Sequence, residues 1–121
     1  MNTQIKQQWI QALKSSHYQQ TTTYLRTEEG YCCLGVLCDL YAKEHDDVEW
    51  DKDGEDDDYE FLSEIQTLPI EVMKWAGLSD RDPYYVVPED IETGKMNICL
   101  SAMNDNGTSF EKIAQVIEEK F

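Results

Sequence analysis

Apolar side chains recur every three or four positions along three segments of the chain, a spacing that predicts helices with one buried face. The first helix begins at Asn2 or Thr3 and should bury Trp9. The second covers residues 33 to about 43 and is so rich in apolar residues that we expect it to be mostly buried. The third begins at Thr108, where Glu111 lies three positions later and completes a capping box.

Shorter patterns predict two further helices, one short strand or extended segment, and an irregular connection. Their residues are 67–77 and 99–103 for the helices, 21–25 for the extended segment and 82–88 for the connection. Pro69 suits the first turn of a helix, and Gly77 suits its end. Pro83 and Pro88 argue against a long regular element between them. Gly35 lowers helix propensity within the second long helix, so we expect another helix to cross close to it.

A β-hairpin with an acidic tip is predicted at about residues 46–60. Residues 48–50 and 59–62 are apolar or aromatic except for one glutamate in each, and they flank an acidic run that contains Gly54. The whole pattern indicates a small α+β protein with four to five helices and a short hairpin or small antiparallel sheet. A length of 121 residues fits a single domain that spans residues 1–121.

Negative charge is concentrated in the predicted hairpin. Eleven of the seventeen residues from Glu44 to Glu60 are Asp or Glu, and Lys52 is the one lysine among them, which places about ten of the chain's 15 net negative charges there. This charge opposes direct binding to nucleic acid, because phosphates would meet like charge. It would attract a basic protein surface instead. The alternative explanation is that the acidity only aids solubility.

The acidic run therefore predicts a surface that binds a basic protein. Its residues are Asp46, Asp47, Asp51, Asp53, Glu55, Asp56, Asp57 and Asp58. The same run can be aligned with a calcium-binding EF-hand loop by placing Gly54 at the invariant glycine. The ligand positions then fall on Glu49, Asp51, Asp53, Asp57 and Glu60. Asp56 takes a position that is normally apolar in such loops, so weak cation attraction is favoured over a specific calcium site.

The four cysteines are expected to be free thiols in a cytoplasmic protein. The N-terminus has no apolar leader, and no apolar stretch approaches the roughly 20 residues that cross a membrane. Cys32, Cys33, Cys38 and Cys99 lack the paired spacing of zinc knuckles. A nucleophilic cysteine working with His17 or His45 would need positive surroundings, whereas these surroundings are acidic and apolar. We therefore predict no catalytic residue and no cofactor.

Aromatic and arginine residues predict an alternative, a pocket for a small nucleotide-like molecule. A base would stack on Tyr31, Trp50, Tyr84 or Tyr85, and a phosphate would meet Arg26 or Arg81. The net charge disfavours an anionic ligand, although one arginine in a pocket can outweigh a distant screened field. A metal-binding protein or enzyme is a weaker third alternative.

The stretch GYCCLGVLCDLY at residues 30–41 resembles the signature of a widespread family of small, largely uncharacterised bacteriophage and prophage proteins. Four further blocks match, at residues 9–15, 68–78, 100–107 and 109–118, so the resemblance covers nearly the whole chain. The acidic segment is longer here than is usual in that family. The resemblance implies a phage-type accessory protein that neutralises a host factor, for example one of antiviral defence, without naming the target.

Overall fold

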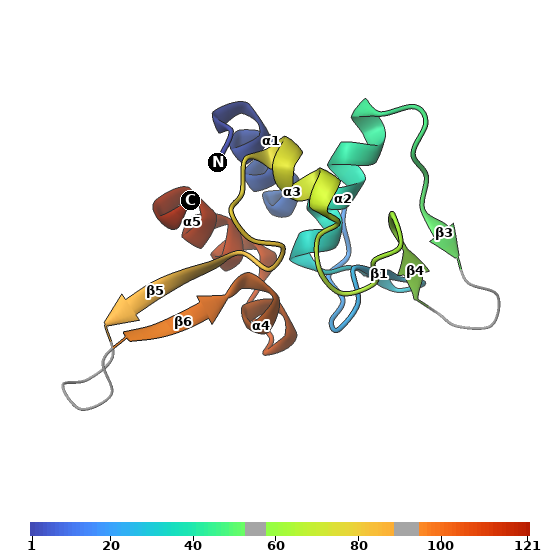
Figure 1. Ribbon diagram of the computed structural model, residues 1–121. Coiled ribbons are helices and arrows are strands. Elements are labelled where there is room, and N and C mark those ends of the chain that lie inside the picture. Colours follow the sequence, from blue (N-terminus) through green and yellow to red (C-terminus); the bar gives the residue numbers. More distant parts are fainter. Residues whose placement is uncertain (53–57, 89–94) are drawn as a thin grey trace.

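Five helices and three antiparallel strand pairs make up the described residues of the computed structural model, which are 1–52, 58–88 and 95–121 (Figure 1). The helices are α1 (Thr3–Lys14), α2 (Cys33–Glu44), α3 (Ile70–Ala76), α4 (Leu100–Asp105) and α5 (Phe110–Lys120). The strand pairs are β1 (Arg26–Thr27) with β2 (Gly30–Tyr31), β3 (Asp51–Lys52) with β4 (Tyr59–Glu60), and β5 (Tyr84–Pro88) with β6 (Lys95–Cys99). The prediction of a small single α+β domain is confirmed.

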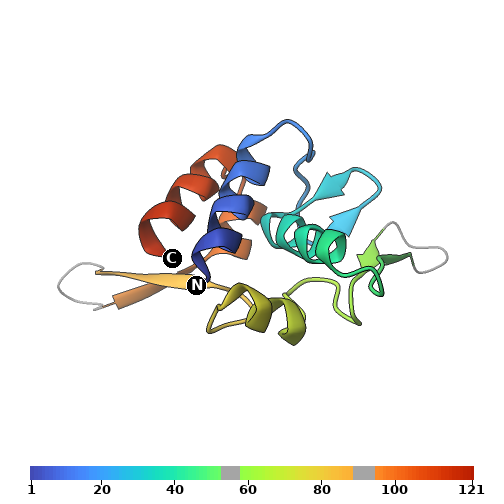
Figure 2. The same ribbon diagram turned by 90° about the horizontal axis from the view of Figure 1, so that it is seen from above.

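Helix α2 forms the centre of the core. Its residues 33–38 are all buried, and α1 packs against both α2 and α5 (Figure 2). Trp9 of α1 is fully buried, and its indole Nε1 donates a hydrogen bond to the Cys33 carbonyl oxygen at 2.9 Å. The predicted burial of Trp9 is therefore confirmed. The indole N–H needs such an acceptor, because an unpaired polar group in the core is costly.

The strand expected at residues 21–25 is not formed, and β1 begins only at Arg26. The backbone N–H of Thr21 bonds to the Tyr31 carbonyl oxygen, whereas that of Leu25 bonds to the Ile65 carbonyl oxygen. Thr23 has a positive φ of 77°, which breaks an extended path between them. The β-branched composition was misleading because these residues bond to two separate segments.

The connection expected to be irregular contains the strand β5, five residues long and paired in antiparallel register with β6. Pro83 immediately precedes this strand, and Pro88 is its last residue. Proline is tolerated at the ends of a two-stranded ribbon, where its missing N–H interrupts no interior ladder bond. The prediction was wrong because proline was read as excluding a strand rather than as bounding one.

The cap of α5 also differs from the prediction by one residue. Ser109, not Thr108, is the N-cap residue, and its side-chain oxygen accepts a hydrogen bond from the Lys112 backbone N–H at 3.2 Å. The carbonyl oxygen of Thr108 instead accepts a hydrogen bond from the Gln20 side-chain amide at 2.8 Å.

The predicted end of α3 is confirmed, since Gly77 adopts the left-handed conformation that terminates it.

The small strand pairs lie at opposite ends of the helical body. Figure 1 shows the β5–β6 ribbon projecting on one side, and β3 and β4 on the other side beyond α2. An isolated antiparallel bridge between Thr27 and Asp58 joins the β1–β2 hairpin to the β3–β4 hairpin. No helix within the described parts of the chain has the length and apolar composition needed to cross a membrane.

Candidate functional site

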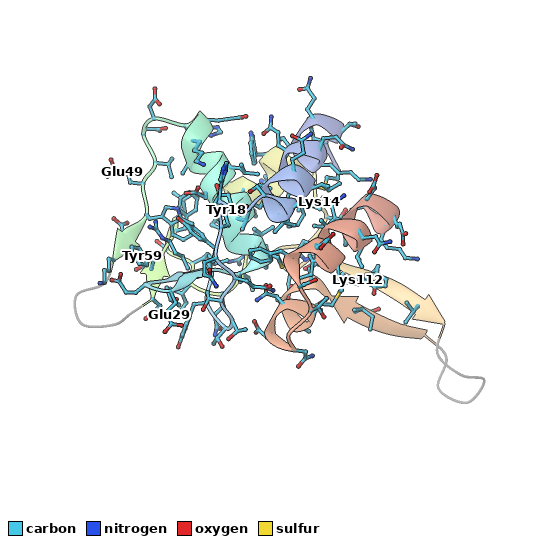
Figure 3. All side chains as sticks on the ribbon, turned by 180° about the vertical axis from the view of Figure 1, so that it is seen from behind. Lys14, Tyr18, Glu29, Glu49, Tyr59 and Lys112 are labelled. Atoms are coloured by element: carbon cyan, nitrogen blue, oxygen red, sulfur yellow. The ribbon has the colours of Figure 1, made fainter. Side chains whose placement is uncertain are left out.

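A shallow acidic hollow of about 460 Å³ lies where the chain leaves α2 and enters β3. Its lining residues are Asp46, Asp47, Val48, Glu49, Asp51, Leu62 and Ser63. We call its four carboxylate residues, Asp46, Asp47, Glu49 and Asp51, the acidic rim, and all four are exposed. Figure 3 shows Glu49 at the same end of the molecule as Tyr59, whereas Lys14 and Lys112 lie toward the other end. The acidic rim therefore lies at one end of the molecule.

The predicted acidic hairpin is formed in part. Its second strand, β4, falls within the predicted residues 59–62, but its first strand, β3, is formed by Asp51–Lys52, and the predicted residues 48–50 form no strand. Asp51 pairs with Glu60 and Lys52 pairs with Tyr59 in an antiparallel register. Asp58 is half-buried and takes part in the bridge to Thr27. The remaining residues predicted to bind a partner, Asp53, Glu55, Asp56 and Asp57, lie outside the described residues.

The calcium-loop alignment can be compared with the structure only in part. Asp53 and Asp57 lie outside the described residues, which leaves Glu49, Asp51 and Glu60. Within residues 1–52, 58–88 and 95–121, no three His, Cys, Asp or Glu side chains come together as metal ligands. Glu49, Asp51 and Glu60 therefore do not form a cluster of metal ligands.

Asp39 on α2 joins two segments that sequence reasoning did not connect. Its Oδ1 accepts a hydrogen bond from the Trp50 indole N–H at 3.1 Å, and its Oδ2 accepts one from the Tyr18 hydroxyl at 2.6 Å. Lys43, one turn further along α2, lies 3.5 Å from the same Oδ2 and donates to the Tyr18 hydroxyl oxygen. Burial and the bond to Asp39 raise the pKa of Tyr18 to about 12, so its hydroxyl remains a donor at neutral pH.

Arg26 lies among three aromatic rings. Its guanidinium carbon is 4.3 Å from the ring centre of Tyr59, 4.9 Å from that of Tyr31 and 5.5 Å from that of Trp50. These distances are typical of cation–π interactions. Arg26, Tyr31 and Trp50 were predicted as ligand-binding residues, and they do lie together. The rings face the protein's own guanidinium.

The other three predicted ligand residues lie elsewhere. Arg81 donates from Nε to the Leu68 carbonyl oxygen at 2.9 Å and forms an ion pair with Glu64. Tyr85 faces the Lys120 ammonium at 5.6 Å. Tyr84, its neighbour in the strand, lines a pocket of about 430 Å³.

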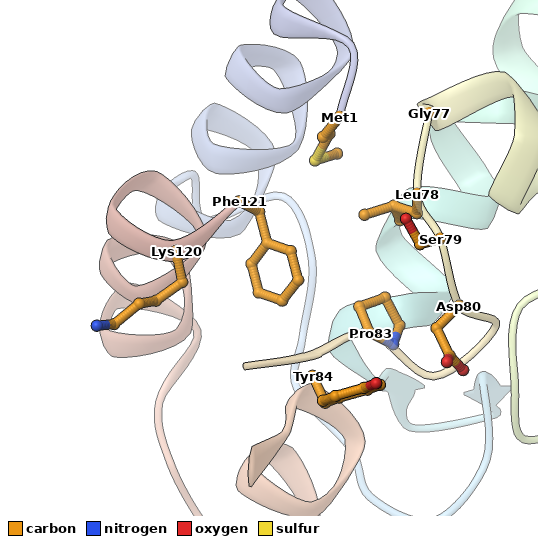
Figure 4. Close-up of a pocket in the computed structure, with 9 residues that line it drawn as sticks. All are labelled: Met1, Gly77, Leu78, Ser79, Asp80, Pro83, Tyr84, Lys120 and Phe121. Atoms are coloured by element: carbon orange, nitrogen blue, oxygen red, sulfur yellow. The ribbon is translucent and has the colours of Figure 1, made fainter. Parts of the chain in front are cut away.

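Figure 4 shows the rings of Tyr84 and Phe121 at that pocket, with Lys120 pointing away from it. The six residues therefore do not form one pocket.

The cysteines provide no reactive centre with the histidines. Burial raises the pKa of the Cys32 thiol to about 11 and those of Cys33 and Cys38 well above their ordinary value. His45 stacks on Tyr41 at 3.9 Å between ring centres, and His17 is exposed at the end of α1. No hydrogen bond between a cysteine and a histidine occurs among the described residues.

These surroundings predict the reactivity of the four thiols. Cys99 is partly exposed, whereas the other three are buried. Desolvation raises the pKa of the Cys99 thiol too, but the reagent can reach only this thiol without opening the fold. A disulfide reagent at pH 8 should therefore titrate about one thiol rapidly in the native protein and all four after denaturation. Replacing Cys99 with serine should remove the rapid phase. Rapid reaction of two or more thiols in native protein would contradict the buried placement.

Sequence reasoning missed Tyr18, Asp39 and Tyr59 as residues that organise this end of the molecule. One signal was available for Asp39, because it is the single charged residue of the 30–41 signature and lies on a helix that is otherwise apolar there. A carboxylate in such a helix requires hydrogen-bond donors from elsewhere in the fold. Its partners, 21 and 11 residues away, could not be identified without the structure.

The fold and this surface define a small α+β domain with one acidic, aromatic-backed end. The family model called Domain of unknown function (DUF8296) matches residues 1–121, and the chain belongs to that family. No curated protein and no solved structure matches the chain.

Proposed function

We propose that this chain is a non-enzymatic, phage-type accessory protein that binds and neutralises a basic, nucleic-acid-handling protein in the host cytoplasm. The observation that carries the proposal is the gathering of four exposed carboxylates in the acidic rim around one hollow. Crowded carboxylates repel one another, and a basic partner relieves that repulsion. The resemblance of the 30–41 signature to phage proteins supports a host component as the target.

The chemistry of the hollow fits lysine and arginine side chains. Val48 and Leu62 are half-buried in its lining and offer apolar surface to the alkyl part of such a side chain. The carboxylates around them can accept hydrogen bonds from its charged end. None of the salt bridges among the described residues uses an acidic-rim carboxylate. The rim thus remains available for ion pairs with a partner.

The nucleotide-pocket alternative has less support. It requires aromatic faces and arginines to converge on a free space, whereas Tyr31 and Trp50 face Arg26 and Arg81 pairs with Glu64. The pocket beside Tyr84 contains no arginine among its lining residues. A co-purifying nucleotide in native mass spectra of the protein from infected cells would restore this alternative.

Two variants of equal net charge test the proposal. The first replaces the acidic rim with its amides (Asp46→Asn, Asp47→Asn, Glu49→Gln and Asp51→Asn). The matched control replaces four exposed glutamates elsewhere (Glu71→Gln, Glu111→Gln, Glu118→Gln and Glu119→Gln). Each is immobilised and exposed to nuclease-treated bacterial lysate, and the retained proteins are identified by mass spectrometry.

We expect the wild type and the control to retain the same basic proteins, and the rim variant to lose them. Loss of four ion pairs should weaken binding to a purified partner by about fourfold or more at low salt, since exposed pairs contribute about 0.2–1 kcal/mol each. Binding should also fall as salt rises, because ions screen exposed charges. Equal retention by both variants, or retention indifferent to salt, would contradict the proposal.

A further inference from the structure

We infer that Tyr18, Arg26, Asp39 and Trp50 act as a clasp that holds the acidic rim in its binding arrangement, so that partner affinity depends on residues outside the rim. This inference rests on the proposed function and assigns positioning roles within it. The clasp connects α2, the β1–β2 hairpin and the segment that carries the rim.

The rim needs an external support because its own segment has little backbone structure. Residues 45–50 lie between α2 and β3 and form neither helix nor strand. The hydrogen bond from the Val48 N–H to the His45 carbonyl oxygen, at 3.2 Å, closes one turn there. Three of the four rim carboxylates fall in this segment, and their repulsion favours its opening. A fixed attachment at its end would oppose that opening.

Trp50 provides the attachment, since it lies between the rim residues Glu49 and Asp51. Its ring packs 4.7 Å from that of Phe61, which is fully buried, and its indole N–H is held by Asp39. The Asp39 side chain is only 15% exposed, and charge-assisted hydrogen bonds strengthen where water is excluded. Cys38, the preceding residue, is fully buried, so the helix that carries the acceptor is fixed in the core.

Arg26 forms the second part of the clasp. Its three aromatic contacts come from separate segments: Tyr31 from β2, Tyr59 from β4, and Trp50 from the end of the rim segment. One guanidinium therefore joins both hairpins to the rim. Arg26 forms no salt bridge to an acidic-rim carboxylate among the described residues, so its link to the rim segment is the contact with Trp50.

The expected consequence is a loss of affinity without any loss of rim charge. When only a fraction of molecules has the binding arrangement, the apparent dissociation constant rises by the inverse of that fraction. Removing one clasp bond that keeps the segment ordered should then weaken binding by about tenfold. A purely structural residue of the core would instead alter the stability of the whole domain.

The experiment uses the full chain, two clasp variants and one matched control. Trp50→Phe keeps an aromatic ring but removes the indole N–H, and Tyr18→Phe removes only the hydroxyl that occupies the other oxygen of Asp39. Tyr84→Phe is the control, since Tyr84 lies in β5, away from the rim segment, and its hydroxyl has no hydrogen-bond partner among the described residues. All three variants keep the wild-type net charge.

Two properties are measured: hydrogen exchange of backbone amides in residues 45–52, and affinity for a deca-arginine peptide. We expect both clasp variants to exchange about tenfold faster in 45–52 and to bind the peptide about tenfold more weakly. Exchange in α1 and α5 should remain as in the wild type, which shows that the domain is folded. The control should match the wild type in both measurements.

Unchanged exchange in 45–52 would overturn the clasp, because the segment would then be ordered without it. Faster exchange with unchanged affinity would overturn its positioning role. Failure of the proposed function gives a different result. The rim variant with four amides would then bind the peptide as tightly as the variant with four glutamates replaced elsewhere, whatever the affinity of the clasp variants.

Discussion

Replacing Asn104 with alanine is expected to lower the free energy of unfolding by about 3–5 kcal/mol, because one buried and two partly buried partners lose a hydrogen bond at once. Asn104 is fully buried in α4. Its Oδ1 accepts from the Gln20 amide at 2.9 Å and from the Cys33 backbone N–H at 3.2 Å, and its Nδ2 donates to the Thr21 carbonyl oxygen at 2.8 Å. The buried N–H of Cys33 and the partly buried carbonyl of Thr21 would be left without these partners.

The position of these bonds explains why the cost should be large. Cys33 is the first residue of α2, and the N–H groups of a first helical turn have no partner within the helix. Asn104 supplies one from α4 and also fixes residues 20 and 21, which lie between α1 and β1. A single side chain thus ties three segments together at the centre of the core.

Denaturant titration of the folded variant measures this loss directly. Asn106→Ala is the matched control, because Asn106 is exposed at the end of α4, and its substitution should change stability by roughly 0.5 kcal/mol or less. A loss below about 1 kcal/mol for Asn104→Ala would mean that water or a shifted side chain replaces the amide's partners.

The long helices were predictable from the sequence because a buried stripe at helical spacing leaves a strong pattern. α1, α2 and α5 each carry such a stripe, and the structure places the three predicted starts, and the predicted end of α2, within one or two residues. α3 was predictable for a different reason, since Pro69 and Gly77 mark its two ends. Local chemistry is sufficient where a helix buries one face or has clear terminal residues.

The short strands were less predictable because tertiary pairing decides them. β1 and β2 are two residues each, too short for any alternation to appear, and β5 lies between prolines that suggested irregular structure. Propensity at residues 21–25 favoured a strand, but the backbone partners available there lie in different segments. β-propensity depends on such partners more than helix propensity does.

The candidate site divides in the same way. The acidic segment was evident from composition, and the aromatic and apolar residues after it indicated the strand β4. The first strand was placed wrongly, because β3 is formed by the charged residues Asp51 and Lys52 rather than by residues 48–50. The clasp was not evident, because Tyr18 precedes α2 in the sequence and Trp50 follows it, and only the fold brings both side chains to Asp39. Arg26, Tyr31 and Trp50 were predicted to share a site, and they do lie together. Composition alone cannot tell whether an aromatic ring binds a ligand or packs against an arginine of the same chain.

Replacing Gly35 with alanine is the second substitution with a large expected effect, and here the usual trend should reverse. Within a helix, alanine is favoured over glycine by about 1 kcal/mol. At Gly35, however, an added Cβ would lie 1.7 Å from the carbonyl oxygen of Leu25 and 2.7 Å from its carbonyl carbon. The prediction of a close approach at this glycine was right in kind, but the approaching element is the chain before β1 rather than another helix.

The Leu25 carbonyl has little freedom to move away. It accepts a hydrogen bond from the Cys32 N–H at 3.0 Å, and the Leu25 side chain is fully buried. Relief of the clash therefore requires α2 to separate from the chain that leads into β1, which exposes the centre of the core. We expect Gly35→Ala to lose about 3 kcal/mol or more, the range of overpacked core substitutions, or to fail to fold.

Circular dichroism and denaturant titration distinguish these outcomes, and Gly107→Ala is the matched control. Gly107 has a positive φ of 93° but no atom within 4 Å of an added Cβ. Its substitution should cost only the strain of that conformation, roughly 1–2 kcal/mol. If Gly35→Ala were as stable as the wild type, the close contact with Leu25 would be wrong. If the variant folds with α2 displaced from Leu25, Asp39 should also move away from Trp50. Backbone amides in residues 45–52 should then exchange hydrogen faster than in the wild type.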